Sequence, residues 1–511
     1  MTVATRASSQ TRHRIHVGEA IGAAAIAVAM IAVHLMFFFW PFRYRQVHPL
    51  LEKVFESKVV VNYYHRTYFP HPGFVAEGVT FFRHGDTHIP PLAEVKRIAV
   101  EGQWGMLLFH PHLLYQISLE GLHVRIPPAG TRARGMDFDD GVVDASQSKL
   151  KIETICADGT VLDFLRNDDS PIRFQFPALQ IHDLEAGRPM QFALTVRTPG
   201  PQATVTASGK VGPFRTTSYR ATPLSGSYRI ESGDLSRLRG LAGHVRGGGQ
   251  FTGIFAKIRV MGSAAIPDFR AGPANRVRLD AQYRVAVNGM NADVQIEGAQ
   301  VRTGSSLITA QGSVAGSPRR VAVTFATQGA EIDDLLRMVE EAEPEVAGKV
   351  NLHAAAEFSP GPQRFLERLQ LQGAIAVEGL HFLDGKTQQR MDAFSARVWK
   401  GGNPAGNSMV ATLAARSETR FEHGVASFPD IEAYVPGAQA SLRGTFDLLN
   451  SRIDLKGKLA MERSLSHAAT GFKAVLLKPL SPFFKRKDAG AVLPITVTGT
   501  AEKPKVSADL F

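Results

Sequence analysis

Histidines and carboxylates are the side chains of this sequence that could bind a metal ion or move a proton. Histidines are frequent before residue 113, and His110 and His112 would point the same way on a strand because only Pro111 separates them. No cysteine lies near this pair, and few carboxylates are paired with each other in this segment. We therefore do not expect a metal site here.

The acidic clusters give no better candidate. Asp137, Asp139 and Asp140 superficially resemble a calcium-binding loop, but the bidentate acidic residue is missing at the required spacing. Asp168 and Asp169 precede Ser-Pro, a sequence typical of a turn, and we find no partner for acid–base chemistry. We predict that both clusters are solvated loops.

Sequence motifs for catalysis are missing as well. The chain contains no nucleophile elbow, no phosphate-binding P-loop and no H-E-x-x-H motif. Gly247, Gly248 and Gly249 come before a predicted strand and no helix follows, so we predict a turn and not a phosphate cradle. The sequence therefore predicts a protein that is not an enzyme and needs no cofactor.

Composition narrows the class of partner. The 511 residues are 44% hydrophobic and 21% charged, which is typical of folded protein, and the length allows several domains or one long repetitive body. The net charge of +11 favours an anionic neighbour. The basic residues are scattered and form no nucleic-acid motif, so an acidic lipid surface is the better candidate. Cys156 is the only cysteine, so no intramolecular disulfide can form.

One segment is long and apolar enough to cross a membrane. Residues 20–40 are apolar apart from His34, and about 20 such residues span the hydrocarbon core of a bilayer. We predict a short cytoplasmic tail over 1–18 and a transmembrane anchor over 19–41, with these anchor residues: Ile21, Ile26, Val28, Ile31, Leu35, Phe38 and Trp40. A cleaved signal peptide is the rival interpretation, but it would end in small residues and this segment ends in bulky aromatic ones.

The positive-inside count does not settle the orientation of this anchor. Arg6, Arg12 and Arg14 precede the segment, but Arg43 and Arg45 follow it. Just beyond, apolar residues recur at helical spacing over residues 47–55, which predicts a juxtamembrane amphipathic helix within residues 42–58.

After residue 58 the apolar period changes from helical to two. In the clearest strand, the apolar face consists of Val277, Leu279, Ala281, Tyr283, Val285 and Val287. Two further alternating runs surround a polar turn at Asn450 and Ser451 and predict a hairpin, with these apolar residues: Leu442, Phe446, Leu448, Ile453, Leu455 and Leu459. We expect a mainly β fold whose antiparallel sheet has one apolar face, with short helices only near residues 332–339 and 364–369.

Two segments do not follow this pattern. Residues 130–148 are polar and rich in Gly and Asp, which predicts a loop insertion. Residues 472–487 combine an apolar run with a basic cluster, and we predict a possible membrane-surface contact at Phe483, Phe484, Lys485, Arg486 and Lys487. A short helix that caps the end of the sheet is the alternative for this segment.

Strand-glycine phrases recur along the chain, and residues 260–267 and 497–504 share the pattern V-x-G-[ST]-A-x-x-P. Together with the single anchor, similar phrases in residues 68–79, 90–95, 117–122 and 124–128 resemble the AsmA-like family of bacterial envelope proteins. The C-terminal phrases at 435–437, 442–444, 455–459 and 493–504 resemble the C-terminal region of that family, which would cover about 330–511.

The resemblance implies an inner-membrane anchor and a β-rich body over 59–511 in the periplasm. It also implies that the sheet curls into a long, apolar-lined groove related to the bridge-like lipid-transfer proteins. The predicted lining would be the apolar strand residues named above, with Ile495 and Val497 added. No catalytic residue or cofactor is implied, and this body is short beside the longest relatives.

These expectations give two hypotheses. The first is a conduit for phospholipids, or an envelope-maintenance factor, whose apolar face shields acyl chains and whose partners are the inner membrane, phospholipids and outer-membrane or envelope proteins. The second is a closed scaffold that assists outer-membrane protein assembly through protein contacts. An open apolar face would favour the conduit, and a fully packed interior would favour the scaffold.

Overall fold

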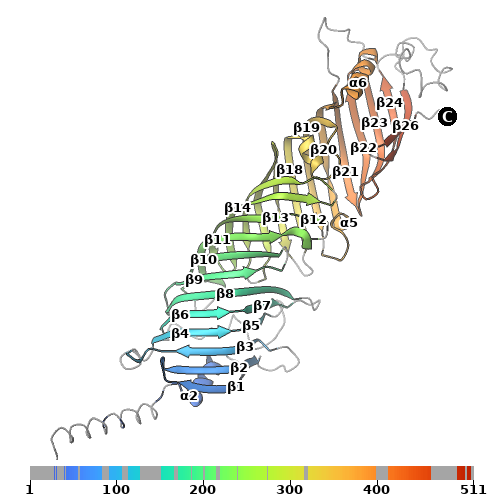
Figure 1. Ribbon diagram of the computed structural model, residues 1–511. Coiled ribbons are helices and arrows are strands. Elements are labelled where there is room, and N and C mark those ends of the chain that lie inside the picture. The colour runs from blue at the N-terminus through green and yellow to red at the C-terminus, as the bar shows by residue number, and fades with distance from the viewer. Residues whose placement is uncertain are drawn as a thin grey trace, which may run out of the picture.

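A single curled sheet accounts for most of the molecule (Figure 1). The computed structural model describes residues 28, 30, 40, 42–55, 58–82, 91–105, 113–126, 151–165, 171–185, 187–199, 202–213, 219–238, 240–272, 274–289, 291–315, 320–358, 360–398, 412–461, 492–500 and 503–507. The described helices are α2 (Tyr44–Phe55), η2 (Tyr219–Ala221), η3 (Leu235–Arg237), α4 (Ile332–Arg337), α5 (Phe365–Arg368) and α6 (Gly385–Val398).

The strands follow one another with few interruptions. In the first half they are β1 (Lys58–Thr67), β2 (Gly73–Phe82), β3 (Ala93–Glu101), β4 (Leu113–Glu120), β5 (His123–Ile126), β6 (Lys151–Asp158), β7 (Thr160–Phe164), β8 (Ile172–Glu185), β9 (Met190–Arg197), β10 (Gln202–Val211), β11 (Pro223–Asp234), β12 (Leu241–Ala242), β13 (His244–Ile254) and β14 (Lys257–Ala271). In the second half they are β15 (Val277–Val287), β16 (Val294–Thr303), β17 (Ser306–Ala315), β18 (Arg320–Glu331), β19 (Val346–Phe358), β20 (Leu369–Phe382), β21 (Leu413–Glu422), β22 (Val425–Val435), β23 (Ala438–Asp447), β24 (Arg452–Met461), β25 (Val492–Thr500) and β26 (Lys503–Ser507).

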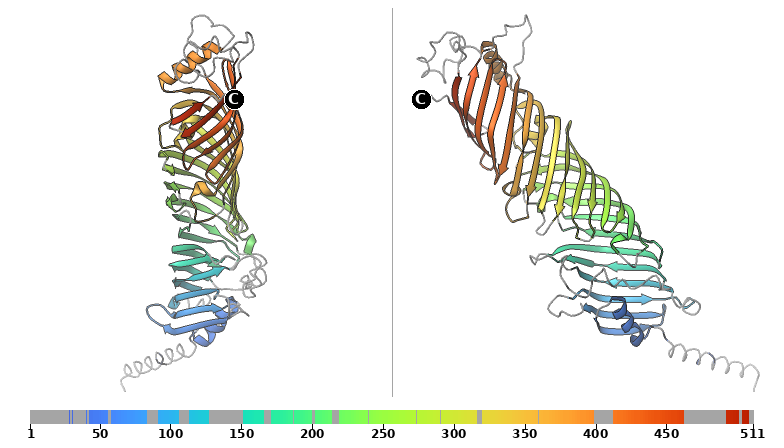
Figure 2. Two further views of the ribbon diagram at one scale, coloured as in Figure 1. Left: turned by 90° about the vertical axis from the view of Figure 1, so that its right-hand side faces the viewer. Right: turned by 180° about the vertical axis from the view of Figure 1, so that it is seen from behind.

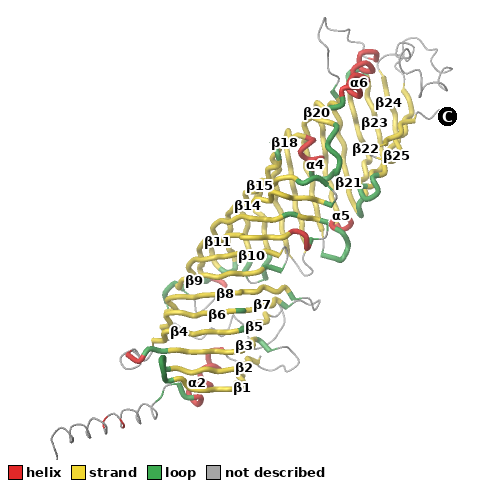
Figure 3. The backbone as a smooth tube through the Cα atoms, viewed as in Figure 1, coloured by secondary structure: helices red, strands yellow, loops and turns green. Residues whose placement is uncertain are grey.

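Nearly every strand pairs antiparallel with its neighbour in sequence, so β1 lies at one edge of the sheet and β26 at the other (Figure 3). This order follows from short connections between alternating strands, which favour antiparallel neighbours. The views in Figure 2 show that the sheet is long, twisted and curled. The curl brings Gly240, beside β12, against α5, where an added Cβ would lie 3.5 Å from the Cβ of Phe365.

One step in the sheet is parallel, which the alternating pattern did not predict. β4 runs parallel to β6 and β5 runs parallel to β7. β4 and β5 together form one long strand that is interrupted at Gly121, which has a positive φ of 62°. β6 and β7 form a second long strand that is interrupted in the same way at Gly159 (66°). Parallel neighbours require a crossover of a dozen or more residues, and residues 127–150, which include the predicted insertion, are available for it. That insertion lies outside the described residues.

The predicted membrane anchor lies outside the described residues except for Val28, Met30 and Trp40. Val28 and Met30 are helical and exposed. Within the part of the chain that the structure describes, no helix is long and apolar enough to cross a membrane.

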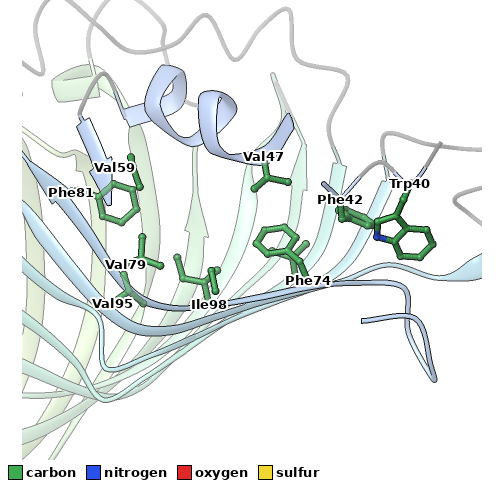
Figure 4. Packing of buried hydrophobic residues seen from close by; sticks show 11 residues of the cluster. Trp40, Phe42, Val47, Val59, Phe74, Val79, Phe81, Val95 and Ile98 are labelled. Carbon is green, nitrogen blue, oxygen red and sulfur yellow. The ribbon is translucent and has the colours of Figure 1, made fainter. Parts of the chain in front are cut away.

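The predicted juxtamembrane helix is present as α2, and it lies on one face of the first strands (Figure 4). That face is called the apolar face below, and the opposite one the polar face. Val47 of α2, Phe74 and Val79 of β2 and Val95 of β3 are all buried in the resulting cluster. Full burial of each such side chain stabilises the fold by about 1.5–3 kcal/mol, so this end of the sheet is a packed core.

Trp40 differs from its predicted role. We placed it among the residues of the membrane anchor, but only 1% of it is exposed, and it belongs to the buried cluster beneath α2. Its ring centroid lies 4.7 Å from that of Tyr68 and 5.6 Å from that of Trp104. The aromatic residues of the first strand connections therefore enclose it within the protein.

Other predictions hold or need correction. The strand at β15, the β23–β24 hairpin and short helices at α4 and α5 are confirmed. Leu448, predicted to line the hairpin, lies instead in the turn after β23, where its N–H donates to the carbonyl of Gly424 at 2.9 Å. Gly247, Gly248 and Gly249 do not form a turn but lie inside β13. Helix α6 was not predicted.

Candidate functional site

The apolar face is the largest continuous feature that the described strands build. One residue from each strand between β2 and β25, apart from the short strands β5, β7 and β12, lies directly opposite its neighbour, and every member is apolar or glycine. We call this set the central row. It runs through Phe74, Val100, Ile117, Ile155, Ile181, Phe192, Gly209, Gly226, Phe251, Val260, Val285, Ile296, Gly312, Val323, Ala356, Leu371, Phe421, Ala426, Phe446, Ile453 and Gly499.

The central row is continuous because residues paired across neighbouring strands share a face. With about 4.8 Å between strands, its path is on the order of 95 Å long. The row one residue along each strand, on the polar face, is different in kind. Over β4–β13 it contains Ser118, Cys156, Gln180, Ala193, Ser208, Ser227 and Gln250. The sheet thus separates an apolar surface from a polar one over most of its length.

Most of the apolar face is not packed as a protein core. Val285, Phe446, Ile453 and Leu455 remain partly exposed, in contrast to the buried residues under α2. Val277 and Leu279, at the end of β15 near β12, are exceptions at 9% and 8% exposure, and so are the paired central-row residues Phe421 and Ala426 at 6% and 5%. The interior of a closed sandwich would be buried throughout. The face is therefore open to solvent along most of the described strands.

Aromatic rings lie next to glycines in the middle of this face. Phe192 and Phe251 flank Gly209 and Gly226 in the central row, and their ring centroids are 6.2 Å apart. A Cβ at Gly226 would lie 2.6 Å from Cζ of Phe251, which leaves no room for a side chain. Glycine at position 226 thus leaves room for a ring from the neighbouring strand to cover the backbone.

Two tyrosines flank two glycines in the same way, in the next row of residues on the apolar face. Tyr228 of β11 and Tyr283 of β15 flank Gly249 and Gly262, and their hydroxyl oxygens are 2.6 Å apart. Burial, and then the hydrogen bond to Tyr283, raise the pKa of Tyr228 well above its usual range. A Cβ added at Gly262 would meet both hydroxyls, whereas at Gly247, Gly248 and Gly249 the nearest atoms to an added Cβ belong to the backbone of the neighbouring strands.

At the β1 end the face is closed by α2, and the same helix protects the sheet edge. The Nε2 atom of His48 lies 3.0 Å from the carbonyl oxygen of Val59, and the N–H of Val59 donates to Oε1 of Glu52 at 3.4 Å. Unpaired backbone groups of an edge strand invite pairing with another chain. Helix α2 therefore both covers the apolar face and occupies part of the β1 edge.

The polar face contains hollows, but their chemistry does not suit acyl chains. One of them, about 980 Å³, is lined by charged side chains of both signs from β20–β24, including Glu418, Arg420, Arg443, Asp454 and Lys456. Two others, of about 790 and 850 Å³, are also lined mainly by polar-face side chains. Interspersed charges of both signs are typical of a solvated surface.

One buried carboxylate deserves chemical scrutiny because it is almost fully enclosed. Asp163 of β7 is 3% exposed and accepts two hydrogen bonds of 2.8 Å from Arg173, with Nε2 of His123 also at 2.8 Å. The hydrogen bonds from Arg173, and secondarily the one from His123, hold the pKa of Asp163 below its usual range. This carboxylate, held in its charged form by two partners, joins β5, β7 and β8.

The predicted lining residues from the two ends of the sequence fall on one face. Val285 lies opposite Val260, Phe446 opposite Ile453 and Leu455 opposite Val497, and all belong to the apolar face. The remaining predicted members on this face are Val277, Leu279, Tyr283, Val287, Leu442, Leu459 and Ile495. Their role in binding lipid stays a prediction. Sequence reasoning missed the places where aromatic rings lie over glycines. Their signal would be a glycine that is in register with an aromatic residue of a nearby strand.

Several candidate residues cannot be placed. His110 and His112, the acidic clusters at 137–140 and 168–169, and the possible membrane-surface contact at 483–487 lie outside the described residues. Among the residues that are described, no three His, Cys, Asp or Glu side chains gather as metal ligands would. A comparison with protein-family models finds no match to this chain, and neither does a comparison with curated proteins.

Proposed function

We propose that this chain is a membrane-anchored protein of the bacterial envelope whose apolar face carries the acyl chains of phospholipids. The observation that supports this best is the central row, an apolar path without a polar interruption in which most members, apart from Phe74, Val100, Phe421 and Ala426, stay partly exposed. In this proposal residues 19–39, which end before the buried Trp40, form the inner-membrane anchor, the body lies in the periplasm, and the curled sheet acts as a groove.

The physical argument rests on what covers an open apolar face. Each methylene group that leaves water contributes about 0.8 kcal/mol, so acyl chains lying along the central row would stabilise it and be stabilised by it. Headgroups would stay in water at the rims, where no specific charge pairing is needed. Such a conduit is passive, which fits a site built from aliphatic, aromatic and glycine residues.

The closed-scaffold hypothesis predicts a different exposure for the residues of the apolar face. Tight packing of this face against other parts of the chain would leave central-row residues buried, as Phe74 is under α2. Partial exposure along β14–β16 and β23–β25 favours the conduit.

Val285→Asp tests the choice directly. An acidic residue in the central row would face hydrocarbon without a partner, at a cost of several kcal/mol to bound acyl chains. We expect the variant to accumulate normally but to carry little phospholipid in native mass spectrometry of detergent-extracted protein. Gln282→Asp, exposed on the polar face of the same strand, is the control and should keep the lipid. Normal lipid content in Val285→Asp would refute the proposed face, and loss of the protein would favour the scaffold.

The location is tested separately. A reporter that is active only in the periplasm should be active when fused after Phe511. Activity of a cytoplasm-only reporter at the same position would overturn the proposed placement of the body.

A further inference from the structure

Aromatic side chains are exposed at the β1 end of the sheet in a way that soluble surfaces seldom show. Phe69, in the turn between β1 and β2, is 81% exposed. Tyr63, on the polar face of β1, is 59% exposed, and Tyr44, the first residue of α2, is 42% exposed. All three lie on the first two elements of the body, which form one end of the molecule (Figure 1).

Exposed basic residues accompany these aromatic ones. Arg45 of α2 and Lys58 and Arg66 of β1 are exposed, and the guanidinium of Arg66 lies 5.9 Å from the ring centroid of Tyr68. Glu52 is the only acidic residue in α2 and β1, and it is engaged with His48 and Val59. Tyr44, Tyr63, Phe69, Arg45, Lys58 and Arg66 are called the aromatic–basic end below.

The aromatic–basic end lies where the chain enters the body. The ring of Phe69 is 5.7 Å from that of Trp104, and Trp104 is 5.6 Å from Trp40, the last residue of the apolar segment. Trp40 is fixed in the core, so the end of that segment and the exposed Phe69 are held close together.

We propose that the aromatic–basic end docks on the surface of a bilayer that contains anionic phospholipid. Aromatic rings prefer the headgroup region, and each basic side chain near an anionic leaflet contributes about 1 kcal/mol. This inference rests on the membrane anchor of the proposed function and not on lipid transport. A tethered surface meets the bilayer at high effective concentration, so modest contacts are sufficient.

The geometry favours a bilayer over a protein strand as the occupant. A partner that extended the sheet would need the outward N–H and C=O groups of β1, and α2 already engages both groups of Val59. Side chains at the end of the sheet remain free to enter the headgroup layer. Docking in this way places the α2-covered start of the apolar face at the membrane surface and directs β26 away from it.

A spin label at position 69 tests the docking. Cys156 is the only cysteine, so Cys156→Ser gives a background in which Phe69→Cys can be labelled alone. The full chain is placed in vesicles of phosphatidylethanolamine and phosphatidylglycerol, and collisions of the label with oxygen and with a water-soluble nickel chelate are measured. We expect a ratio of oxygen to nickel collisions several times larger at position 69 than at a control label, Gln300→Cys, which is exposed on the polar face of β16.

Each other outcome counts against the inference in a distinct way. Equal ratios at the two sites, in protein that floats with the vesicles, would overturn the docking while leaving the anchor intact. Protein that does not float with the vesicles would overturn the anchor and the docking with it. Strong dipolar coupling between labels, without oxygen contact, would assign this surface to a second copy of the chain.

Discussion

The α2 end and the β23–β25 end of the sheet carry the same alternating pattern, yet the structure treats their apolar faces differently. Val59, Val79 and Phe81 are at most 3% exposed beneath α2. Phe446 and Ile453, at the other end, remain partly exposed. Helix α6 packs mainly against β20, and Ser395 Oγ donates at 2.7 Å to the carbonyl of Pro436, which lies at the opposite end of β23 from Phe446.

This difference separates two roles that one sequence pattern can serve. Alternation sets which face is apolar, but only a covering element converts that face into a core. The α2 end is built for stability, and the β23–β25 end keeps apolar surface available. A folded domain gains little by leaving such a surface open unless something else occupies it.

The largest expected contrast comes from placing a charge at each end. Val79→Asp buries a carboxylate that has no partner and should destabilise the α2 end by about 4 kcal/mol or more. Leu455→Asp places the same group where water can reach it, and about 1 kcal/mol is expected. Urea unfolding of the detergent-solubilised chain, followed by tryptophan fluorescence and by circular dichroism, measures both. Similar losses in the two variants would show that the far end is covered too.

A gentler version uses two phenylalanines of the central row. Phe74→Ala should cost about 3–5 kcal/mol, because the ring leaves a cavity within a packed cluster. Phe446→Ala removes a ring that is already partly exposed, and about 1–2 kcal/mol is expected. Thermal unfolding of the two variants compares them. The comparison fails if Phe446→Ala is the more damaging change.

Prediction from the sequence succeeded where the signal is local. The alternation in residues 277–287 identified β15 and its faces, and apolar spacing identified α2. It failed where the cause is a tertiary contact. Gly247, Gly248 and Gly249 were interpreted as a turn because glycine is the usual turn residue, but they lie inside β13, where an added Cβ would meet the backbone of β11 or β14.

Prediction from the sequence also failed for elements and residues whose position depends on contacts with distant parts of the chain. Helix α6 has a mostly polar sequence, so its apolar spacing gave no signal. Trp40 looked like the end of a membrane segment because its neighbours in sequence are apolar, whereas its burial depends on Tyr68 and Trp104. The parallel step at β4 and β6 leaves the alternation unchanged, so no pattern in the strands could have shown it.

The middle of the face should behave in an intermediate way, and glycine substitutions test this. A Cβ at Gly262 would overlap the Tyr228 hydroxyl and lie 2.6 Å from the carbonyl oxygen of Gly248. We expect Gly262→Ala to separate the tyrosine pair and cost about 1–3 kcal/mol. Gly298→Ala is the matched control, because a Cβ there meets no atom within 4 Å. Equal effects of the two substitutions in urea unfolding would show that the rings do not lie closed over β14.

The smallest expected effect belongs to the hydroxyl pair itself. Tyr228→Phe keeps the ring over Gly249 and removes one hydrogen bond, and Tyr283 can turn to water, so a loss of about 0.5–1.5 kcal/mol in the free energy of unfolding is expected near neutral pH.

Because burial raises the pKa of Tyr228, the folded state favours its neutral form. The resulting stabilisation is fully present below the ordinary tyrosine pKa of about 10 and declines as the pH rises above it. The free energies of unfolding of the native chain and of Tyr228→Phe, measured from about two units below that pKa to about one unit above it, should therefore converge at the alkaline end. A difference between Tyr228→Phe and the native chain that stays constant with pH would mean that the hydroxyl pair is as open to water as the residues of the β23–β25 end.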